Sequence, residues 1–559
     1  MCIRDMLFPM LFEKQDWVLG KVLQKQSELN GDLPFIQFED GPMHTYREAH
    51  ELSNRVGNAF IQRNVAFGEN VALMLDNCLE YLWCWIGLSR IGAVPVAINT
   101  ALKGNFLKHV LTNTNCRIGV FEDKYLEWLV DIEDDLPSLE EIYVIGLAKE
   151  VRFKRIRLKP FQEVMRGQPN NISIDITYRD IAAIMFTSGT TGPSKGVRMP
   201  HAHLFLFGEC LHTHMRITTS DKYYITLPLF HAQGLAMMTY GTMIAGASAV
   251  LKKTFRASTW IEDIKKYEIT LTNLLGAMND FVLAQPACDS DSRNHLRMVC
   301  ALPVSDQTLH KLRKRFKIPK FFEAYGMTEC NIPISRPFDA PDTAGCSGKV
   351  WEEYFEVIIA DPNSDEELPV GEVGEILVRP KEAFCFMQEY NRMPDRTVET
   401  WRNMWFHTGD AGRKDSEGFI WYVDRIKDTI RRRGENISSY EVEAILLEHP
   451  AIVEAAAVAV EADQGGEDEV LACIVLQEGY PVPKLIDLMD FCAARMPHFC
   501  VPRYVEFFDD LPKTPNSKIK KDELRKRGRS PKTLDREDLS LIHISEPTRP
   551  ERIAFGVVW

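Results

Sequence analysis

The sequence predicts an α/β fold: a large N-terminal domain of α/β subdomains with a small β region, followed by a smaller α+β domain. Three observations lead to this prediction. Over about the first 340 residues, short apolar segments alternate with helical ones, the order typical of largely parallel sheets covered by helices. Short strands separated by Gly and Pro turns then indicate a β region. Finally, 559 residues are too many for one hydrophobic core.

The alternation starts near the N-terminus. Thr45 and Glu48 form a predicted capping box, after which apolar residues recur on one helical face. Segments 71–75, 79–91 and 94–98 then have the patterns of a strand, a helix and a strand. Further along the chain, helical segments separate seven more predicted strands: RIGVFED, IYVIG, AAIMFT, YYITLPL, SAVLKK, ITLTNLL and RMVCALP.

The predicted β region includes EVIIA (356–360) and GEILVR (374–379). We place the N-terminal domain at 7–424, a hinge within VDRIKD at 425–427, and the C-terminal domain at 428–530. The last of these holds a helix, a hairpin, a second helix and a basic end.

Composition and charge exclude several classes of protein. The net charge of −13 leaves no basic excess to neutralise nucleic-acid phosphates. Thirteen cysteines without a C-x-x-C pair argue against metal clusters and disulfides and favour a reducing compartment. Apolar stretches such as YLWCWIGL are far shorter than the roughly 20 residues of a membrane span. We therefore expect a cytoplasmic protein with no nucleic-acid partner and no transmembrane segment; an oligomer is possible.

The two ends of the chain show neither periodicity nor helix caps. Residues 1–6 and 540–559 resemble translated adapter fragments at the ends of assembled reading frames. We expect 540–559 to be a non-native or disordered tail and exclude both ends from the fold prediction.

One stretch is rich in Gly, Ser and Thr. TSGTTGPSKG (187–196) follows the apolar run IAAIMF (181–186), so that a strand leads into a loop with one lysine. Backbone N–H groups and hydroxyls in such a loop can hold an anion, although a surface connection has the same composition. The order of residues around Lys195 is not that of a Walker loop.

Five further motifs follow it in a fixed order: PLFHAQG (228–234), EAYGMTE (323–329), WFHTGD (405–410), YVDRIKDTIRRRGENIS (422–438) and LPKTPNSKIKKDEL (511–524). Together the six resemble the adenylate-forming superfamily of acyl-CoA ligases, luciferases and peptide-synthetase adenylation domains, over about residues 10–530. The residues in these motifs are most similar to those of crotonobetaine/carnitine-CoA ligases and related acyl-CoA ligases.

The resemblance implies an AMP-forming acid–thiol ligase that uses ATP, Mg²⁺ and CoA. A carboxylic acid would attack the α-phosphate of ATP, leave as an acyl-adenylate and be transferred to CoA. The 187–196 loop would surround the β- and γ-phosphates. Pro193-Ser194 departs from the usual order before the lysine. The residues implied in phosphate binding are Thr187, Ser188, Gly189, Thr190, Thr191, Gly192 and Lys195.

The YGMTE motif would serve the nucleotide and the metal. Glu329 resembles the family's magnesium ligand, and a carboxylate oxygen is what Mg²⁺ prefers. Thr328 would contact the α-phosphate, while Tyr325 and Gly326 would lie near the adenine. In isolation, these five residues would indicate only an aromatic residue beside a turn.

Three other residues are implied in substrate binding. Asp410 matches the carboxylate that accepts hydrogen bonds from the ribose diol, and Arg425 matches an arginine that also reaches the ribose. His231 matches the histidine that gates the carboxylate pocket. Taken singly, Asp410 suits a turn and His231 suits a packed core.

The C-terminal motifs imply a domain that is mobile and serves both half-reactions. Lys518 matches the lysine that contacts the acid and the α-phosphate during adenylation, although Ser517 replaces the usual glycine before it. Lys427 falls at the hinge, and Gly434 would help to form the pantetheine tunnel. Arg431–Arg433 could meet CoA phosphates or be a solvated patch.

The acid itself stays open between a crotonobetaine/carnitine type and a fatty-acid type. A quaternary ammonium would need an aromatic cage, for which Phe230, Tyr240 and Trp260 are candidates; residues 273–280 would line the acyl pocket. Two alternatives remain: a stand-alone adenylation enzyme that loads a carrier protein, and a non-catalytic binder of nucleotide or acyl-CoA.

Overall fold

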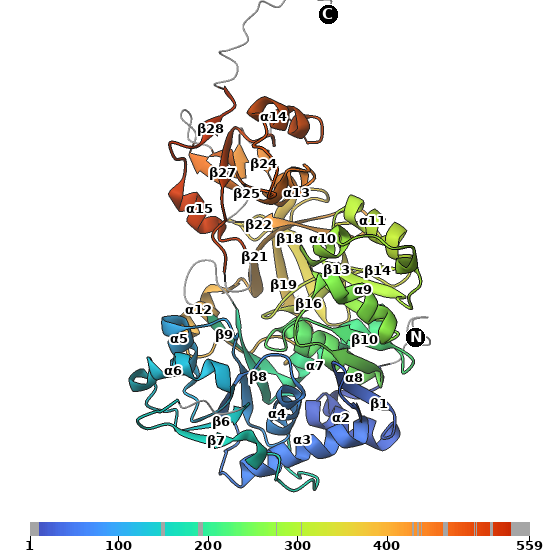
Figure 1. Cartoon of the computed structure of the whole chain (residues 1–559), viewed down its shortest axis with the longest axis vertical. Coiled ribbons are helices and arrows are strands. Elements are labelled where there is room, and N and C mark those ends of the chain that lie inside the picture. Colours follow the sequence, from blue (N-terminus) through green and yellow to red (C-terminus); the bar gives the residue numbers. More distant parts are fainter. Residues whose placement is uncertain are drawn as a thin grey trace, which may run out of the picture. The chain divides into compact units, whose positions relative to one another are not determined.

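The computed structural model describes residues 10–146, 151–187, 194–275, 277–302, 304–426, 430–432, 435–437, 439–461, 468–496, 498, 500–514 and 518–537 (Figure 1). The chain divides into two compact units, Met1–Tyr422 and Val423–Trp559. Each unit has its own apolar cores.

The first sheet has seven strands, in the order β7-β6-β5-β3-β4-β8-β9. All neighbours are parallel except β8 and β9, which form an antiparallel hairpin. Its elements are β3 (Asn70–Met74), β4 (Val94–Ala97), β5 (Ile118–Glu122), β6 (Glu141–Ile145), β7 (Arg157–Pro160), β8 (Ile181–Thr187) and β9 (Lys195–Pro200), with helices α3 (Tyr46–Ile61), α4 (Leu79–Ser89), α5 (Gly104–Thr114) and α6 (Glu127–Val130).

The predicted strand–helix–strand series is confirmed here. β3, α4 and β4 occupy the three segments read from the sequence. The capping box of α3 is also present. Thr45 accepts a hydrogen bond from the backbone N–H of Glu48 at 3.2 Å, and the Glu48 carboxylate accepts one from the Thr45 N–H at 2.9 Å.

The second sheet also has seven strands, in the order β14-β13-β12-β10-β11-β1-β2, and only the β1–β2 pair is antiparallel. Its strands are β1 (Pro34–Phe38), β2 (Met43–Thr45), β10 (Lys222–Ile225), β11 (Ser248–Leu251), β12 (Leu271–Leu275), β13 (Met298–Leu302) and β14 (Phe321–Phe322). The accompanying helices are α2 (Leu19–Leu29), α7 (His201–Met215), a π-helix (Gln233–Thr239), α8 (Tyr240–Ala245), α9 (Ala257–Lys266), α10 (Ala277–Ala284) and α11 (Asp306–Phe316).

The third sheet is the predicted β region, and its paired strands are antiparallel. Its elements are β15 (Ala324–Met327), β16 (Asn331–Ser335), β17 (Cys346–Val350), β18 (Phe355–Ala360), β19 (Val373–Pro380), β20 (Trp401–Arg402), β21 (Trp405–Lys414) and β22 (Ile420–Arg425), with α12 (Pro394–Glu399). The sheet starts at Ala324, earlier than residue 340, because the turn-like YGMTE motif itself supplies a strand.

Helix α7 lies at the centre of the large unit. Fourteen of its fifteen residues are buried, as expected for a helix that is apolar on nearly all sides. It contacts β8 and β9 of the first sheet and β16 of the third. The largest core therefore holds residues from all three sheets, and α7 can connect motifs that are far apart in sequence.

The second unit contains the predicted hairpin, two helices and basic end. β25 (Ile452–Glu461) and β26 (Asp468–Leu476) form the hairpin, and β27 (Tyr504–Phe508) runs parallel to β26. The remaining elements are β23 (Ile430–Arg432), β24 (Glu435–Ile437), β28 (Leu534–Asp535), α13 (Ser439–Leu447), α14 (Leu485–Ala493) and α15 (Lys521–Arg527).

Candidate active site

The 187–196 motif connects the two strands of a hairpin. Thr187 ends β8 and Lys195 begins β9, and the two residues are paired across the hairpin. The Ser194 carbonyl accepts a hydrogen bond from Nε2 of His109, on α5, at 2.8 Å. Residues 188–192, the rest of the implied phosphate loop, lie outside the described residues. The pairing of β8 with β9 therefore fixes the two ends of the loop relative to each other.

A short segment, 388–391, extends this hairpin along the edge of β9. The Asn391 N–H donates to the Gly196 carbonyl at 2.7 Å, and the Gln388 N–H donates to the Arg198 carbonyl at 2.9 Å. The backbone of Tyr390 is thereby bridged to Val197. The segment brings Tyr390 beside the phosphate-loop hairpin, a contact that the sequence did not suggest.

Glu329 lies close to the loop end of the β8–β9 hairpin. Its Oε1 accepts a hydrogen bond from the Tyr390 hydroxyl at 2.9 Å and one from Thr187 Oγ1 at 3.4 Å. The Lys195 ammonium lies 4.4 Å from the centre of the Tyr390 ring, within cation–π range. Three of the residues singled out in the sequence, Thr187, Lys195 and Glu329, therefore meet around Tyr390.

Helix α7 carries a histidine that contacts the backbone of the YGMTE motif. Nε2 of the buried His203 lies 2.8 Å from the Thr328 carbonyl, and Nδ1 lies 3.2 Å from that of Cys385. The Asn331 side chain donates to the His203 carbonyl at 2.8 Å. Burial lowers the pKa of His203 to about 4, so its ring is neutral near pH 7 and has one N–H to donate.

Tyr325 and Asp410, which the motifs imply in nucleotide binding, are in direct contact. The Tyr325 hydroxyl donates to Asp410 Oδ2 at 2.7 Å, and its ring stacks on Tyr422 with centres 6.0 Å apart. Burial raises the pKa of Tyr325 well above its usual value, which keeps the hydroxyl a donor. A Cβ at Gly326 would lie 2.2 Å from the Asn331 carbonyl oxygen, so only glycine fits there.

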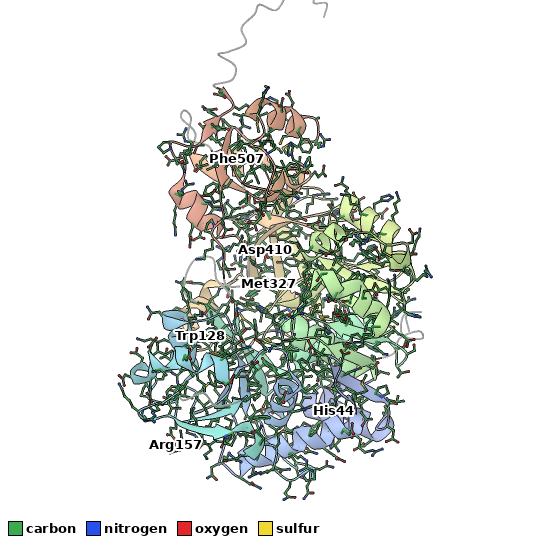
Figure 2. All side chains as sticks on the ribbon, in the orientation of Figure 1. His44, Trp128, Arg157, Met327, Asp410 and Phe507 are labelled. Atoms are coloured by element: carbon green, nitrogen blue, oxygen red, sulfur yellow. The ribbon has the colours of Figure 1, made fainter. Side chains whose placement is uncertain are left out.

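The HTGD motif lies within strand β21, and a buried carboxylate anchors it. Glu375, on β19, accepts from the Gly409 N–H at 2.9 Å and lies 3.0 Å from Nδ1 of His407. Gly409 has a φ of +70°, a conformation that favours glycine. The hydrogen bond to Gly409 therefore holds the backbone next to Asp410, which lies on the third sheet (Figure 2).

His231 belongs to a separate turn after β10. The Asn77 amide clamps this segment: it donates to the Leu227 carbonyl at 3.0 Å and accepts from the Leu229 N–H at 2.8 Å. The turn leads into the π-helix, a feature often found at functional sites. The gating role of His231 stays a prediction.

Two predicted residues belong to the second unit. Lys518 is exposed, and its carbonyl accepts a hydrogen bond from the Thr514 N–H at 2.7 Å. Arg425 ends β22 and is also exposed. Their roles stay predictions. Lys427 and Gly434 lie outside the described residues.

Comparisons with known proteins place this geometry in a family. A model described as "AMP-binding enzyme" matches residues 23–390, and one for the "AMP-binding enzyme C-terminal domain" matches 441–518. The chain belongs to the AMP-binding enzyme family. It is an adenylate-forming acyl-CoA ligase, as its six motifs indicated.

Relatives and solved structures agree with this assignment. The crotonobetaine/carnitine–CoA ligases of Salmonella agona and Salmonella typhimurium are each 31% identical over 488 residues, covering 86% of this chain and 93% of theirs. ATP-bound MatB from Rhodopseudomonas palustris and the anthranilate CoA ligase AuaEII with anthranoyl-AMP each have a TM-score of 0.81 and 25% identity. They cover 92% of this chain and 99% and 98% of their own. MenE from Bacillus subtilis with ATP and magnesium has a TM-score of 0.76 at 25% identity, over 92% of this chain and 100% of its own.

Two sequence interpretations of this AMP-binding enzyme are wrong. Arg432 is not part of a solvated patch or available to CoA phosphates, because its buried guanidinium lies 2.6 Å from the Glu469 carboxylate. Tyr240 and Trp260 do not share a cage, since they pack in different cores. Tyr240 contacts Trp85, and Trp260 contacts Phe316.

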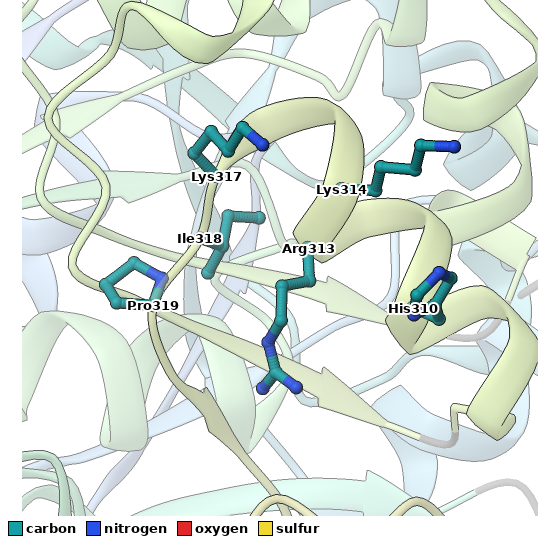
Figure 3. Close-up of a pocket in the computed structure, with 6 residues that line it drawn as sticks. All are labelled: His310, Arg313, Lys314, Lys317, Ile318 and Pro319. Atoms are coloured by element: carbon teal, nitrogen blue, oxygen red, sulfur yellow. The ribbon is translucent and has the colours of Figure 1, made fainter.

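A cavity of about 320 Å³ lies elsewhere, at the end of α11 (Figure 3). Its cations complement the negative end of the helix dipole, and Arg313 also pairs with Asp342. We therefore read it as a helix-end feature. The lining residues are His310, Arg313, Lys314, Lys317, Ile318 and Pro319.

Two features are absent from the described residues. No three His, Cys, Asp or Glu side chains there form a group that could hold a metal ion. No helix in the described part of the chain is long and apolar enough to cross a membrane.

Proposed function

We propose that this chain activates a carboxylic acid of the crotonobetaine/carnitine or fatty-acid type with ATP and transfers it to CoA, releasing AMP and pyrophosphate. The observation that carries the proposal is the meeting of Thr187, Lys195 and Glu329 around Tyr390. A hydroxyl, an ammonium and a carboxylate at one loop base suit the binding of phosphate oxygens together with a cation.

Adenylation needs charge to be neutralised in line with the attack. A carboxylate oxygen attacks the α-phosphorus, and the bond to pyrophosphate breaks. Lys195, at the loop base, would attract the β- and γ-phosphates and so favour the leaving group. Lys518, from the second unit, would contact the acid and the α-phosphate where negative charge develops.

Glu329 fits a magnesium ligand. Its carboxylate is buried, with 3% of the residue exposed, and its Oε1 receives hydrogen bonds from two hydroxyls. A single protein carboxylate suits Mg²⁺, which takes much of its coordination from water and substrate phosphates. When bound, the ion would neutralise phosphate charge during the displacement.

Asp410 would bind the ribose. Its Oδ2 receives the Tyr325 hydroxyl, and Glu375 holds the backbone of the neighbouring Gly409. The carboxylate is therefore oriented before nucleotide arrives, which reduces the entropy lost on binding. Arg425 would reach the same ribose, and His231 would gate the entry of the acid.

The second half-reaction transfers the acyl group. The thiol of CoA attacks the acyl carbon, the thiol proton is lost and AMP leaves. We assign to Gly434 a place in the pantetheine tunnel and to Lys427 the hinge of a mobile C-terminal domain. The 31% identity to crotonobetaine/carnitine–CoA ligases supports an acid of that class.

The test is a panel of acids incubated with ATP and Mg²⁺, with and without CoA, in which AMP and acyl-CoA are measured by mass spectrometry. The panel holds carnitine, crotonobetaine, short to long fatty acids, aryl acids and a bile acid. We expect AMP and a thioester from one acid class. AMP without thioester would instead favour the carrier-loading enzyme, and no AMP from any acid the non-catalytic binder.

A further inference from the structure

Tyr390 contacts two oppositely charged groups of the candidate site. Only 1% of the residue is exposed. Its hydroxyl donates to Glu329 Oε1 at 2.9 Å, and its ring centre lies 4.4 Å from the Lys195 ammonium. The residue therefore contacts the phosphate-loop lysine with its ring and the proposed metal ligand with its hydroxyl.

We propose that Tyr390 is a positioning residue that prepares Glu329 for the cation and Lys195 for phosphate. This inference rests on the proposed function. Both hydrogen bonds that the described residues donate to the Glu329 carboxylate go to Oε1, which fixes its rotation and directs Oε2 to the ion. The face of the Tyr390 ring meanwhile attracts the Lys195 ammonium, which gives this charge a partner other than a carboxylate.

The surroundings hold Tyr390 firmly enough for this role. Its backbone bridges Val197, and the next residue, Asn391, donates to the Gly196 carbonyl at 2.7 Å. The Asn391 side chain also donates to Asn113, on α5, at 3.0 Å. The segment that carries Tyr390 is thus tied to β9 and to α5, and the phenol has little freedom to leave its two partners.

Tyr390→Phe tests the hydroxyl, because it keeps the ring over Lys195. ATP binding is measured by calorimetry over a series of Mg²⁺ concentrations, without acid, so that no turnover occurs. We expect the half-saturating Mg²⁺ concentration to rise roughly tenfold or more, since residues that support a metal ligand have effects of this size. ATP binding in EDTA should be unchanged.

The ring is tested with pentafluorophenylalanine at position 390, compared with Tyr390→Phe. This side chain has nearly the same shape as phenylalanine, so both proteins are expected to fold. Its fluorine atoms reverse the electrostatics of the ring face. ATP affinity in EDTA should fall by about two- to thirtyfold, the range from an exposed to a buried cation–π contact. Equal affinities in the two proteins would overturn the role assigned to the ring.

Tyr224→Phe is the matched control. The Tyr224 hydroxyl donates to Asp263 at 2.7 Å, and Lys252 lies 3.3 Å from the same carboxylate, but these residues belong to β10, α9 and a different core. Its Mg²⁺ dependence should equal that of the wild type. An equal shift in this control, or none in Tyr390→Phe, would overturn the proposal. A wild type that binds no ATP would instead refute the proposed function.

Discussion

The two lysines that the motifs single out lie in very different surroundings. Lys195 starts a strand, is paired with Thr187 across a hairpin and lies against the buried Tyr390 ring. Lys518 is exposed in the other unit, where its backbone bonds to Thr514. A charge built into a sheet can bind phosphate throughout the reaction, whereas an exposed charge suits a step that requires movement.

Lys518→Ala should have the largest effect. If Lys518 stabilises the charge that develops during adenylation, acid-dependent exchange of pyrophosphate into ATP should fall by about a hundredfold to a thousandfold. Thioester formation from a supplied acyl-adenylate should persist. Both half-reactions are followed by chromatography. Equal losses in the two would show that Lys518 does not serve one step alone.

Lys195→Gln should have a smaller effect of a different kind. Because Lys195 is fixed beside the loop, it should bind ATP in the ground state as well as in the transition state. We expect the KM for ATP to rise roughly tenfold while kcat changes less. Initial rates over a range of ATP concentrations measure the split. A loss confined to kcat would mean that the two lysines do not differ in this way.

Tyr325→Phe should have a modest effect. It removes the hydrogen bond to Asp410 at 2.7 Å but keeps the ring stacked on Tyr422. A lost hydrogen bond to a charged group costs about 1.5–3 kcal/mol, a small part of which should reach the KM for ATP, because the Asp410 carboxylate that would bind the ribose stays in place. An unchanged KM with a lower melting temperature would assign the bond to stability alone.

His203 should give the smallest functional effect and a distinct pH dependence of stability. Its pKa is about 4 in the folded chain, below the ordinary value of 6.5, so the unfolded chain takes up its proton first as pH falls. Stability should therefore decrease from pH 6.5 towards pH 4, by roughly 3 kcal/mol in total from this residue. Urea unfolding at several pH values measures it.

The control for that measurement is His203→Gln. Glutamine keeps a donor for the Thr328 carbonyl and does not titrate. Its stability should fall less steeply between pH 6.5 and pH 4 than that of the wild type. Parallel curves for the two proteins would show that His203 is not the group responsible.

The sequence predicted much of the fold because local patterns determine it. The strand–helix–strand order of the first two sheets follows from apolar periodicity, and the α3 capping box follows from two residues three apart. The sequence did not predict the start of the third sheet, because Gly326 and its neighbours have the composition of a turn. That strand depends on pairing with β16 rather than on its own propensity.

The site was predictable only in part. Motif order pointed to Thr187, Lys195 and Glu329, but not to Tyr390 or His203, whose partners lie 61 and 125 residues away in the chain. Nothing in the sequence around Tyr390 signals its contacts. The helix at 201–215 carries four histidines, and nothing in its sequence distinguished His203 from the other three. For Arg432 the sequence shows the charge, but the charge run does not reveal that Glu469 is its buried partner.

The central claim is that one chain couples ATP cleavage to thioester formation through an adenylate. It is tested most directly by the stoichiometry of one reaction with the best acid of the panel, CoA, ATP and Mg²⁺. The account predicts equal amounts of AMP, pyrophosphate and acyl-CoA. ADP with phosphate, or AMP without acyl-CoA, would contradict it.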